Sequence, residues 1–385
     1  MSDRIRIRVL DAVRAGRGEA TKKSIENATG LACATVCKTV DSLLADRTIF
    51  ARREAPSGRG RPALPLALNL DSALFAGLDL GGESWRILFS DLGFSRLYYR
   101  KIATPPYEGR ETFFRHLFAF IRSSLAESRL DAAKLRLIGL AVSANTDPDT
   151  GVVVSAGNMG IRWGANLPVR EEVEREFGVP ACVITTQAAA AWAEYKFGTA
   201  AGTGDLVTVG LGVGIGAAII AQHQLIVSRP DRPAGYIGHL YIPGNREICV
   251  CGYRGCLEAF AGARSLAAIA RRRHENDPAY PLWQNAAAID LAAAAGDRRA
   301  VALLNRAAAC DAVGIAGLIQ MYQPDALIFS GGQSRENGYL YNAVLRRLKR
   351  LVPEDRRRGM RISITSLGDA QSALGVIRLA YEKFF

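Results

Sequence analysis

Hydrophobic residues recur at helical spacing in the N-terminal part of the chain. A first helix is expected over about residues 4–15, although the alternation of arginine with isoleucine there also fits a strand. A second helix opens near Thr21 and ends at Gly30, because glycine readily takes the left-handed conformation that closes a helix. A third spans about residues 33–45, with apolar positions at i, i+4, i+7 and i+8: Val36, Val40, Leu43 and Leu44.

Two short apolar runs follow, at residues 48–53 and 63–70, and a basic, turn-rich segment separates them. This segment includes Gly58-Arg59-Gly60-Arg61-Pro62, so a β-hairpin with a basic tip is predicted. Three helices and a hairpin in this order are typical of a winged helix-turn-helix, whose third helix lies in the major groove of DNA. The alternative is a small helical cap followed by a basic linker.

The face of the third helix opposite its apolar positions is the one expected to approach DNA. Thr35, Cys37 and Lys38 lie on that face and are the candidate contacts to bases or phosphates. Arg59 and Arg61 are expected to enter the minor groove, where glycine permits close approach and the negative potential attracts guanidinium groups. The predicted partner is double-stranded operator DNA.

Charge supports this prediction because it is concentrated at one end of the chain. The 385 residues carry a net charge of +12. Residues 1–70 hold 13 lysines and arginines against 7 aspartates and glutamates, a net charge of +6, and the other 315 residues share the remaining +6. Hydrophobic residues make up 49% of the chain, enough for two or three buried cores. Because the sequence has neither an apolar run of roughly 18 residues nor a signal peptide, we expect a cytoplasmic protein that does not bind membranes.

Apolar strands beyond residue 74 end at glycine-rich turns. The first strand delivers Asp79 and Gly81-Gly82 to a turn, and such a turn can hold phosphate on its backbone N–H groups and a metal ion on the aspartate. Comparable turns occur at Gly210–Gly216 and at Ser330-Gly331-Gly332. Three strand-ending glycine turns spread over two lobes favour the actin-like nucleotide-binding fold, an α/β architecture.

A histidine and three cysteines form the strongest chemical signal. His239, Cys249, Cys251 and Cys256 make a complete tetrahedral ligand set for Zn²⁺. Four protein ligands leave no open position for substrate or water, so the predicted zinc is structural. The alternative is four unrelated residues in a reducing compartment.

Taken together, these motifs resemble the ROK family (repressor, open reading frame, kinase), in its regulator branch with an N-terminal winged helix. The resemblance covers nearly the whole chain and rests on six segments: Thr29-Gly30-Leu31, Gly58–Pro62, Asp79–Gly82, Gly235–His239, Gly255–Glu258 and Ser330–Gly332. It implies a two-lobed actin-like domain with a structural zinc, usually dimeric or tetrameric. Sugar kinases and sugar-responsive repressors share that fold.

The kinase chemistry implied by the family requires a base that is absent from this chain. The family's kinases supply an aspartate in a Glu-Asn-Asp-Ala-Asn segment, and Thr186 stands at that position. A threonine hydroxyl cannot act as a base near neutral pH. Glu83 and Leu211 also replace threonines of the two phosphate turns. We therefore expect a regulator without catalysis, and a sugar kinase fused to a DNA-binding domain is the alternative.

The resemblance also implies where an effector would bind. The family's sugar-binding positions read Thr185, Thr186, Tyr236, His239 and Glu258 here, and only the last two keep the family pattern. Asn158 is retained in a neighbouring loop. Tyr236 and Trp192 either stack on a sugar ring or fill space where ligand binding has been lost.

The sequence as a whole predicts a DNA-binding transcriptional regulator, a repressor of carbohydrate-related genes. Residues 1–70 are expected to form the winged helix-turn-helix and residues 71–385 the ROK domain. Within it, lobe 1 covers about residues 71–190 plus the C-terminal helix, and lobe 2 covers about residues 191–365. A homodimer or homotetramer would present paired DNA-binding modules to a pseudo-palindromic operator, and a sugar or sugar derivative would act as effector.

Overall fold

The computed structural model describes every residue except 1–2, 53–63, 107, 156–165, 228 and 230–233. The chain begins with the expected helices: α1 (Asp3–Ala15), α2 (Lys22–Thr29) and α3 (Cys33–Ala45). The first segment is helical because Val9, Leu10 and Val13 bury together on one side, which a strand could not achieve. Gly30 closes α2 with φ of 63°, as predicted.

A short strand pair follows the helices. Strands β1 (Ile49–Ala51) and β2 (Leu66–Leu68) are antiparallel, which confirms the pairing of the two apolar runs. The basic tip that would form the wing, with Arg59 and Arg61, lies outside the described residues.

The first large sheet has the strand order β5-β4-β3-β6-β9. Its strands are β3 (Leu74–Leu80), β4 (Ser84–Ser90), β5 (Arg96–Ala103), β6 (Leu135–Val142) and β9 (Ala181–Thr185). Helices α4 (Gly109–Ser128) and α5 (Val169–Phe177) cover one face, and α13 (Gln371–Phe384) covers the other. A small hairpin of β7 (Asn145–Asp147) and β8 (Val152–Ser155) lies beside this sheet.

The second sheet repeats the same order with β12-β11-β10-β13-β14. Its strands are β10 (Leu206–Leu211), β11 (Ile215–Ala221), β12 (Gln224–Leu225), β13 (Ala326–Ser330) and β14 (Arg361–Ile364). In both sheets an antiparallel meander is extended by two parallel strands beside its first strand. This repetition confirms the predicted α/β fold with two actin-like lobes.

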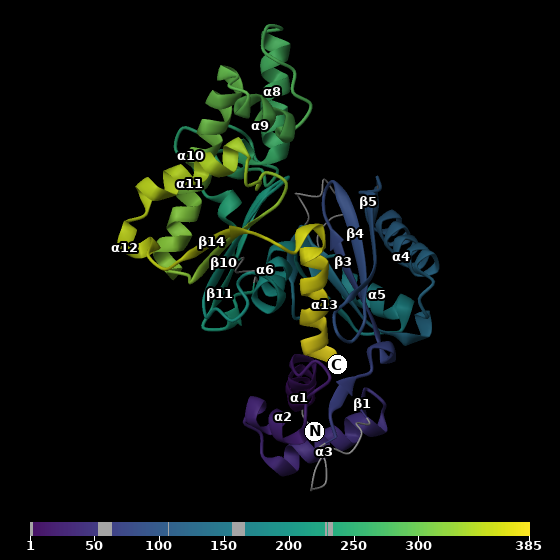
Figure 1. The fold of residues 1–385 in the computed structure, drawn as a ribbon. Helices are drawn as coiled ribbons and strands as arrows, with labels where there is room; N and C mark the ends of the chain where they lie inside the picture. The colour runs from purple at the N-terminus through teal and green to yellow at the C-terminus, as the bar shows by residue number, and fades with distance from the viewer. Residues whose placement is uncertain (1–2, 53–63, 107, 156–165, 228, 230–233) are drawn as a thin grey trace.

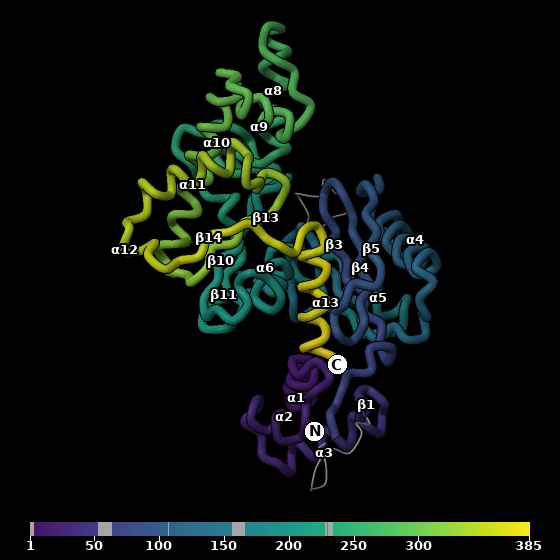
Figure 2. The backbone as a smooth tube through the Cα atoms, viewed as in Figure 1, coloured from purple at the N-terminus to yellow at the C-terminus, as the bar shows by residue number. Residues whose placement is uncertain are grey.

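Helices surround the second sheet and join it to the first. The surrounding helices are α7 (Glu258–Ala261), α8 (Ala263–Asn276), α9 (Ala286–Ala294), α10 (Arg298–Tyr322), α11 (Tyr339–Leu351) and α12 (Glu354–Arg357). Helix α6 (Thr186–Phe197) packs Trp192 against strands of the second sheet and also contacts α13. After β14 the chain crosses back to α13, whose C-terminal end lies against α1 (Figures 1 and 2).

Glycines allow α13 to lie unusually close to its neighbours. A Cβ on Gly77 of β3 would lie 2.1 Å from the carbonyl oxygen of Ala373, and one on Gly139 of β6 would lie 2.8 Å from that of Val376. On the other side, a Cβ on Gly375 would lie 1.8 Å from the carbonyl oxygen of Ala189 in α6. Side chains larger than hydrogen at these points would push the helix away from both the sheet and α6.

The long helix α10 bears on the expectation that the chain does not cross a membrane. By length and mean hydropathy alone it is long and apolar enough to span a bilayer. However, 67% of that stretch is buried inside the protein. The core helix of a soluble protein passes the same test, so α10 is weak evidence for a membrane span.

Candidate functional site

A cleft of about 1680 Å³ opens between the two sheets. Five residues expected at a ligand site line it: Thr185, Thr186, Tyr236, His239 and Glu258. They come from the β9–α6 junction, from the turn around residue 238 and from α7, so the fold brings together segments distant in sequence. Asn158, the sixth predicted residue, lies outside the described residues.

The two threonines stand where strand β9 becomes helix α6. The hydroxyl of Thr185 accepts a hydrogen bond from the backbone N–H of Ala188 at 3.3 Å and so caps the helix. The hydroxyl of Thr186 lies 3.4 Å from that of Ser143. These neutral groups can donate and accept hydrogen bonds from the cleft wall.

The aspartate of the first glycine turn is buried and ion-paired. Asp79 lies directly opposite Arg86 in the β3–β4 ladder, and its Oδ2 is 3.0 Å from Nη1 of the arginine. Burial raises the pKa of Asp79 to about 6, although the guanidinium of Arg86 opposes the rise. The negative charge of Asp79 is therefore balanced by a positively charged side chain of the protein itself.

Two further charges extend this cluster along the cleft. Asp369, just before α13, lies 2.6 Å from Nζ of Lys101 and 3.8 Å from Nε of Arg86. Arg86, Lys101 and Asp369 were not predicted from the sequence. Only the first had a sequence signal, because a tight β3–β4 hairpin places Arg86 across from Asp79.

Gln187 occupies the space beside the second glycine turn. A Cβ on Gly210 would lie 2.3 Å from its Nε2, and one on Gly216 would lie 3.0 Å from its Cγ. The side chain therefore crosses both glycines of β10 and β11 from the first turn of α6. Gln187 was not predicted from the sequence either, because a glutamine in an alanine-rich helix belongs to no motif.

Of the two aromatic residues whose role was left open, only Tyr236 lines the cleft. Trp192 packs in an apolar cluster with Leu206 and Ile328 of the second sheet, so it fills space there. Burial raises the pKa of Tyr236 to about 12, which keeps its hydroxyl neutral. Its ring lies 5.6 Å from that of His239.

The ligand atoms of His239, Cys249, Cys251 and Cys256 all lie within 4.8 Å of one another. The sulfurs of Cys251 and Cys256 are 3.7 Å apart, and the sulfur of Cys249 is 3.6 Å from Nδ1 of His239. Two sulfurs bound to one tetrahedral zinc at 2.3 Å would be about 3.8 Å apart. The donor set and its spacing therefore fit a single zinc ion.

Local backbone geometry brings these ligands together. Gly252 and Gly255 have φ of 90° and 86°, the left-handed region that glycine adopts most easily. Glu258 lies behind the cluster, with Oε1 at 3.6 Å from the sulfur of Cys249 and Oε2 accepting from the backbone N–H of Ile215 at 3.2 Å. The metal cluster and the cleft thus share His239 and Glu258 as a common wall.

On α3, Lys38 is exposed, whereas Thr35 and Cys37 are half-buried. The most accessible face of the helix also carries Ala34 and Asp41. Asp41 pairs with Lys22 of α2 at 2.7 Å, which ties two helices of the module together. Of the three predicted α3 contacts, Lys38 is therefore the best exposed.

Comparison with known proteins places this architecture in a family. The model of the ROK family matches residues 75–383. The chain belongs to the ROK family. A xylose repressor from Caldicellulosiruptor bescii is 26% identical over 90% of this chain and 88% of its own length.

Two solved ROK structures resemble the chain to different extents. A ROK family transcriptional regulator, a homologue of the E. coli MLC protein, superposes with a TM-score of 0.80 at 21% identity, covering 98% of this chain and 97% of its own. A ROK family glucokinase from Streptomyces griseus, in complex with glucose and AMPPNP, gives 0.66 at 27% identity over 80% of this chain and 99% of its own. A coverage of 98% cannot omit the first 70 residues, so the regulator shares the N-terminal fold as well.

The buried ion pair of this ROK cleft predicts a pH-dependent stability change. In Arg86→Gln, Asp79 loses its counter-charge, and its folded-state pKa rises further above the unfolded value near 4. Stability then falls as pH rises through the folded-state pKa. We expect the free energy of unfolding to drop by about 3 kcal/mol at pH 7.5 and by clearly less at pH 5, as measured by urea denaturation.

The double variant Asp79→Asn/Arg86→Gln is the matched control. It shares the Arg86→Gln change with the single variant and replaces Asp79 by an uncharged residue of the same size, so its difference from wild type should lack this extra loss on going from pH 5 to pH 7.5. An equal loss at both pH values in Arg86→Gln would show that the arginine acts through packing and not through its charge.

Proposed function

We propose that this protein is a sugar-responsive transcriptional repressor that binds operator DNA through its N-terminal module. The observation that carries the proposal is the module itself: three helices and a strand pair precede the ROK region. The xylose repressor relative spans 90% of this chain, whereas the glucokinase structure covers 80%. The regulator structure, which matches 98% of this chain, supports the same architecture.

In this proposal α3 is the recognition helix. Lys38 projects from its accessible face and would contact bases or phosphates, with Thr35 and Cys37 at the margin of the contact. Arg59 and Arg61, which lie outside the described residues, would enter the minor groove as the wing. A homodimer or homotetramer in the cytoplasm would place two such modules on one operator.

The ROK region, in this proposal, binds sugar without phosphorylating it. Glucokinase relatives favour the alternative of an active kinase. Three features of the cleft oppose that alternative: Thr186 at the expected base position, Gln187 across the glycines of the second turn, and Asp79 already paired with Arg86. Phosphoryl transfer needs a base, room for phosphate and a metal-binding carboxylate, and each is compromised here.

The same cleft retains groups suited to sugar hydroxyls. Glu258 accepts hydrogen bonds, the hydroxyls of Thr185 and Thr186 line one wall, and Tyr236 offers a neutral hydroxyl and a ring face. Asn158 completes the proposed effector set. Xylose or a related sugar is the effector class that the repressor relative suggests.

We assign a structural zinc ion to His239, Cys249, Cys251 and Cys256. Bound zinc would fix the loop that carries Cys249 and Cys251 against α7, next to the cleft. With Nδ1 of His239 turned toward the sulfur of Cys249, its Nε2 would remain for the effector. The metal would thus support the ligand site without taking part in chemistry.

The DNA-binding proposal predicts a loss of affinity on removal of the basic contacts. On an operator selected from random DNA by wild-type protein, Lys38→Ala and Arg59→Ala/Arg61→Ala should each weaken binding about tenfold in gel-shift titrations. The slope of affinity against salt should also flatten, because fewer phosphate counterions are released. Lys349→Ala/Arg350→Ala, exposed basic residues of α11, is the control. Unchanged affinity in the first two variants would overturn the assignment.

The zinc assignment predicts about one equivalent of zinc per chain in purified protein, measured by elemental analysis. Cys251→Ser removes an exposed zinc ligand with little effect on packing. This substitution should abolish zinc binding and lower the melting temperature by several degrees. Cys33→Ser, an exposed cysteine on α3, should leave the metal content unchanged. A stable wild-type protein without metal would contradict the assignment.

Binding without turnover is the expected behaviour of the cleft. D-xylose or D-glucose at 100 times its dissociation constant should stabilise the protein by about 2.7 kcal/mol, seen as a raised melting temperature. Neither sugar should stimulate ATP consumption. Glu258→Gln should weaken sugar binding about tenfold, which lowers the stabilisation at the same sugar concentration to about 1.4 kcal/mol. Sugar-dependent ATP turnover that a cleft substitution abolishes would instead establish the kinase alternative.

A further inference from the structure

We propose that helix α13 mechanically couples the cleft to the DNA-binding module, with Asp369 as its contact at the cleft and Arg378 as its contact at α1. The regulatory meaning of this coupling rests on the proposed repressor function. The coupling itself is a property of the fold and can be measured without DNA or sugar.

The N-terminal end of α13 is part of the cleft wall. Asp369, Gln371 and Ser372 all line the cleft. Asp369 binds Lys101 of β5 at 2.6 Å and lies near Arg86, which in turn holds Asp79. A ligand that alters this charge cluster therefore acts directly on the end of the helix.

The body of α13 is held so that it moves as a unit. Its close contacts with β3 and β6 on one side and with α6 on the other depend on glycines. At these points backbone lies against backbone, so no flexible side chain can adjust if the helix moves. Gln371 adds hydrogen bonds from its Nε2 to the carbonyl oxygen of Ala190 at 3.3 Å and to Oε1 of Glu194 at 3.0 Å. A 14-residue helix spans about 21 Å and transmits displacement along its axis.

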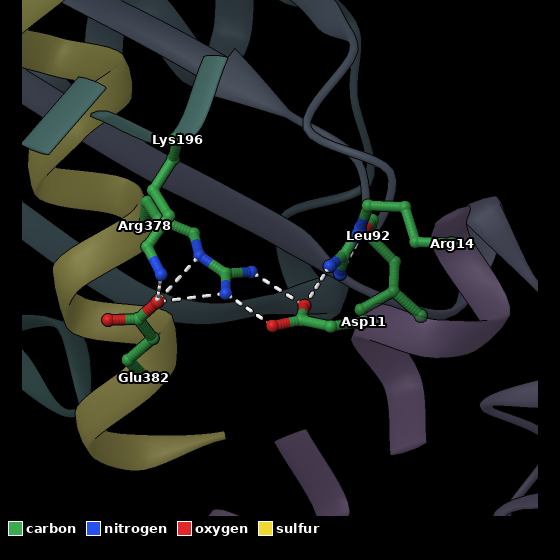
Figure 3. Close-up of polar contacts among 6 residues, drawn as sticks. All are labelled: Asp11, Arg14, Leu92, Lys196, Arg378 and Glu382. Carbon is green, nitrogen blue, oxygen red and sulfur yellow. Dashed lines mark hydrogen bonds and ion pairs between the residues drawn. The ribbon is translucent and has the colours of Figure 1, made fainter. Parts of the chain in front are cut away.

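The C-terminal half of α13 binds α1 through Arg378 (Figure 3). The guanidinium of Arg378, only 5% exposed, donates to both carboxylate oxygens of Asp11 at 2.8 and 2.5 Å. Such a two-pronged pair fixes orientation as well as distance. Although burial acts against ionisation, the hydrogen bonds and charges of Arg378 and Arg14 lower the pKa of Asp11, so the carboxylate is charged at neutral pH.

Neighbouring groups lock this contact in place. Arg14 of α1 also bonds to Asp11, donates to the carbonyl oxygen of Leu92 at 3.0 Å and lies 4.3 Å from the centre of the Phe94 ring. The orientation of α1 is thus set by the same lobe that carries the cleft.

A second helix reaches the same point from the cleft. α6 begins at Thr186 and Gln187 beside the ligand site, and near its other end Lys196 lies 3.1 Å from Glu382. Glu382 accepts from Nε of Arg378 at 2.9 Å. Two helices that start at the cleft therefore converge on the arginine that holds α1. An effector that prefers one lobe arrangement would shift the position of α1 and hence of α3.

Hydrogen–deuterium exchange of the full-length protein tests this coupling. Asp369→Asn loosens the cleft end of α13, about 13 Å of helix rise from Arg378, the residue that binds α1. We expect exchange in peptides from α1 to quicken about fivefold or more, the lower range of allosteric coupling. The same substitution added to Asp11→Asn/Arg378→Gln should have no further effect on α1, because the contact at the other end is already lost.

Two controls separate coupling from general loosening. Glu127→Gln breaks the 3.0 Å ion pair between Arg100 and Glu127 elsewhere on the same lobe and should leave α1 unchanged. Peptides from α10 report global opening and should not change in Asp369→Asn. Unchanged exchange in α1, an equal rise in α10, or an effect that persists in the Asp11→Asn/Arg378→Gln background would each overturn the coupling.

Gel shifts of the same variants keep the two proposals apart. If the exchange pattern appears but wild-type protein binds no DNA, the repressor function fails while the coupling stands. If wild-type protein binds DNA and α1 is insensitive to Asp369→Asn, the coupling fails while the repressor function stands.

Discussion

The close approach of α13 to its surroundings is the constraint on which the rest of the molecule depends. Gly77 and Gly139 let it lie directly on the first sheet, and Gly375 lets it meet the backbone of α6. Because α6 packs on the second sheet, α13 is connected to both lobes: directly to the first sheet and through α6 to the second. Its far end then supports α1, so a single packed element sets the geometry of cleft, lobes and DNA-binding module.

The cleft lies between the two lobes of the ROK fold, and its charged side chains are paired with one another. Asp79 is satisfied by Arg86, Asp369 by Lys101, and Gln187 fills space beside the glycine turn. The protein itself supplies the counter-charges of these two carboxylates. In the proposed function, a bound sugar acts by changing the arrangement of the two lobes and not by serving as a substrate.

Much of this could be predicted where the signal is carried by local sequence. Ligand-type residues at compact spacing identified the His239 and cysteine cluster, helical periodicity identified α1 to α3, and glycines marked the strand ends. Other features arise only when distant segments meet. No local pattern joins Asp11 to Arg378, and Trp192 looks the same in sequence whether it faces a cleft or a core. Periodicity of α3 also overstated the exposure of Thr35 and Cys37, because a face opposite the core is still partly covered by neighbouring helices.

The pairing of Asp11 with Arg378 also has a consequence for biosynthesis. The two residues are 367 positions apart, and the second lies in the last helix of the chain. At ordinary translation rates, roughly 20 to 70 seconds pass between the synthesis of the one and the other. During that time Asp11 can pair with Arg14 of the same helix but not with Arg378, and α1 has no α13 to pack against. A chain that ends before α13 would therefore carry every residue of the proposed DNA contact and still lack Arg378, which helps to fix the orientation of α1.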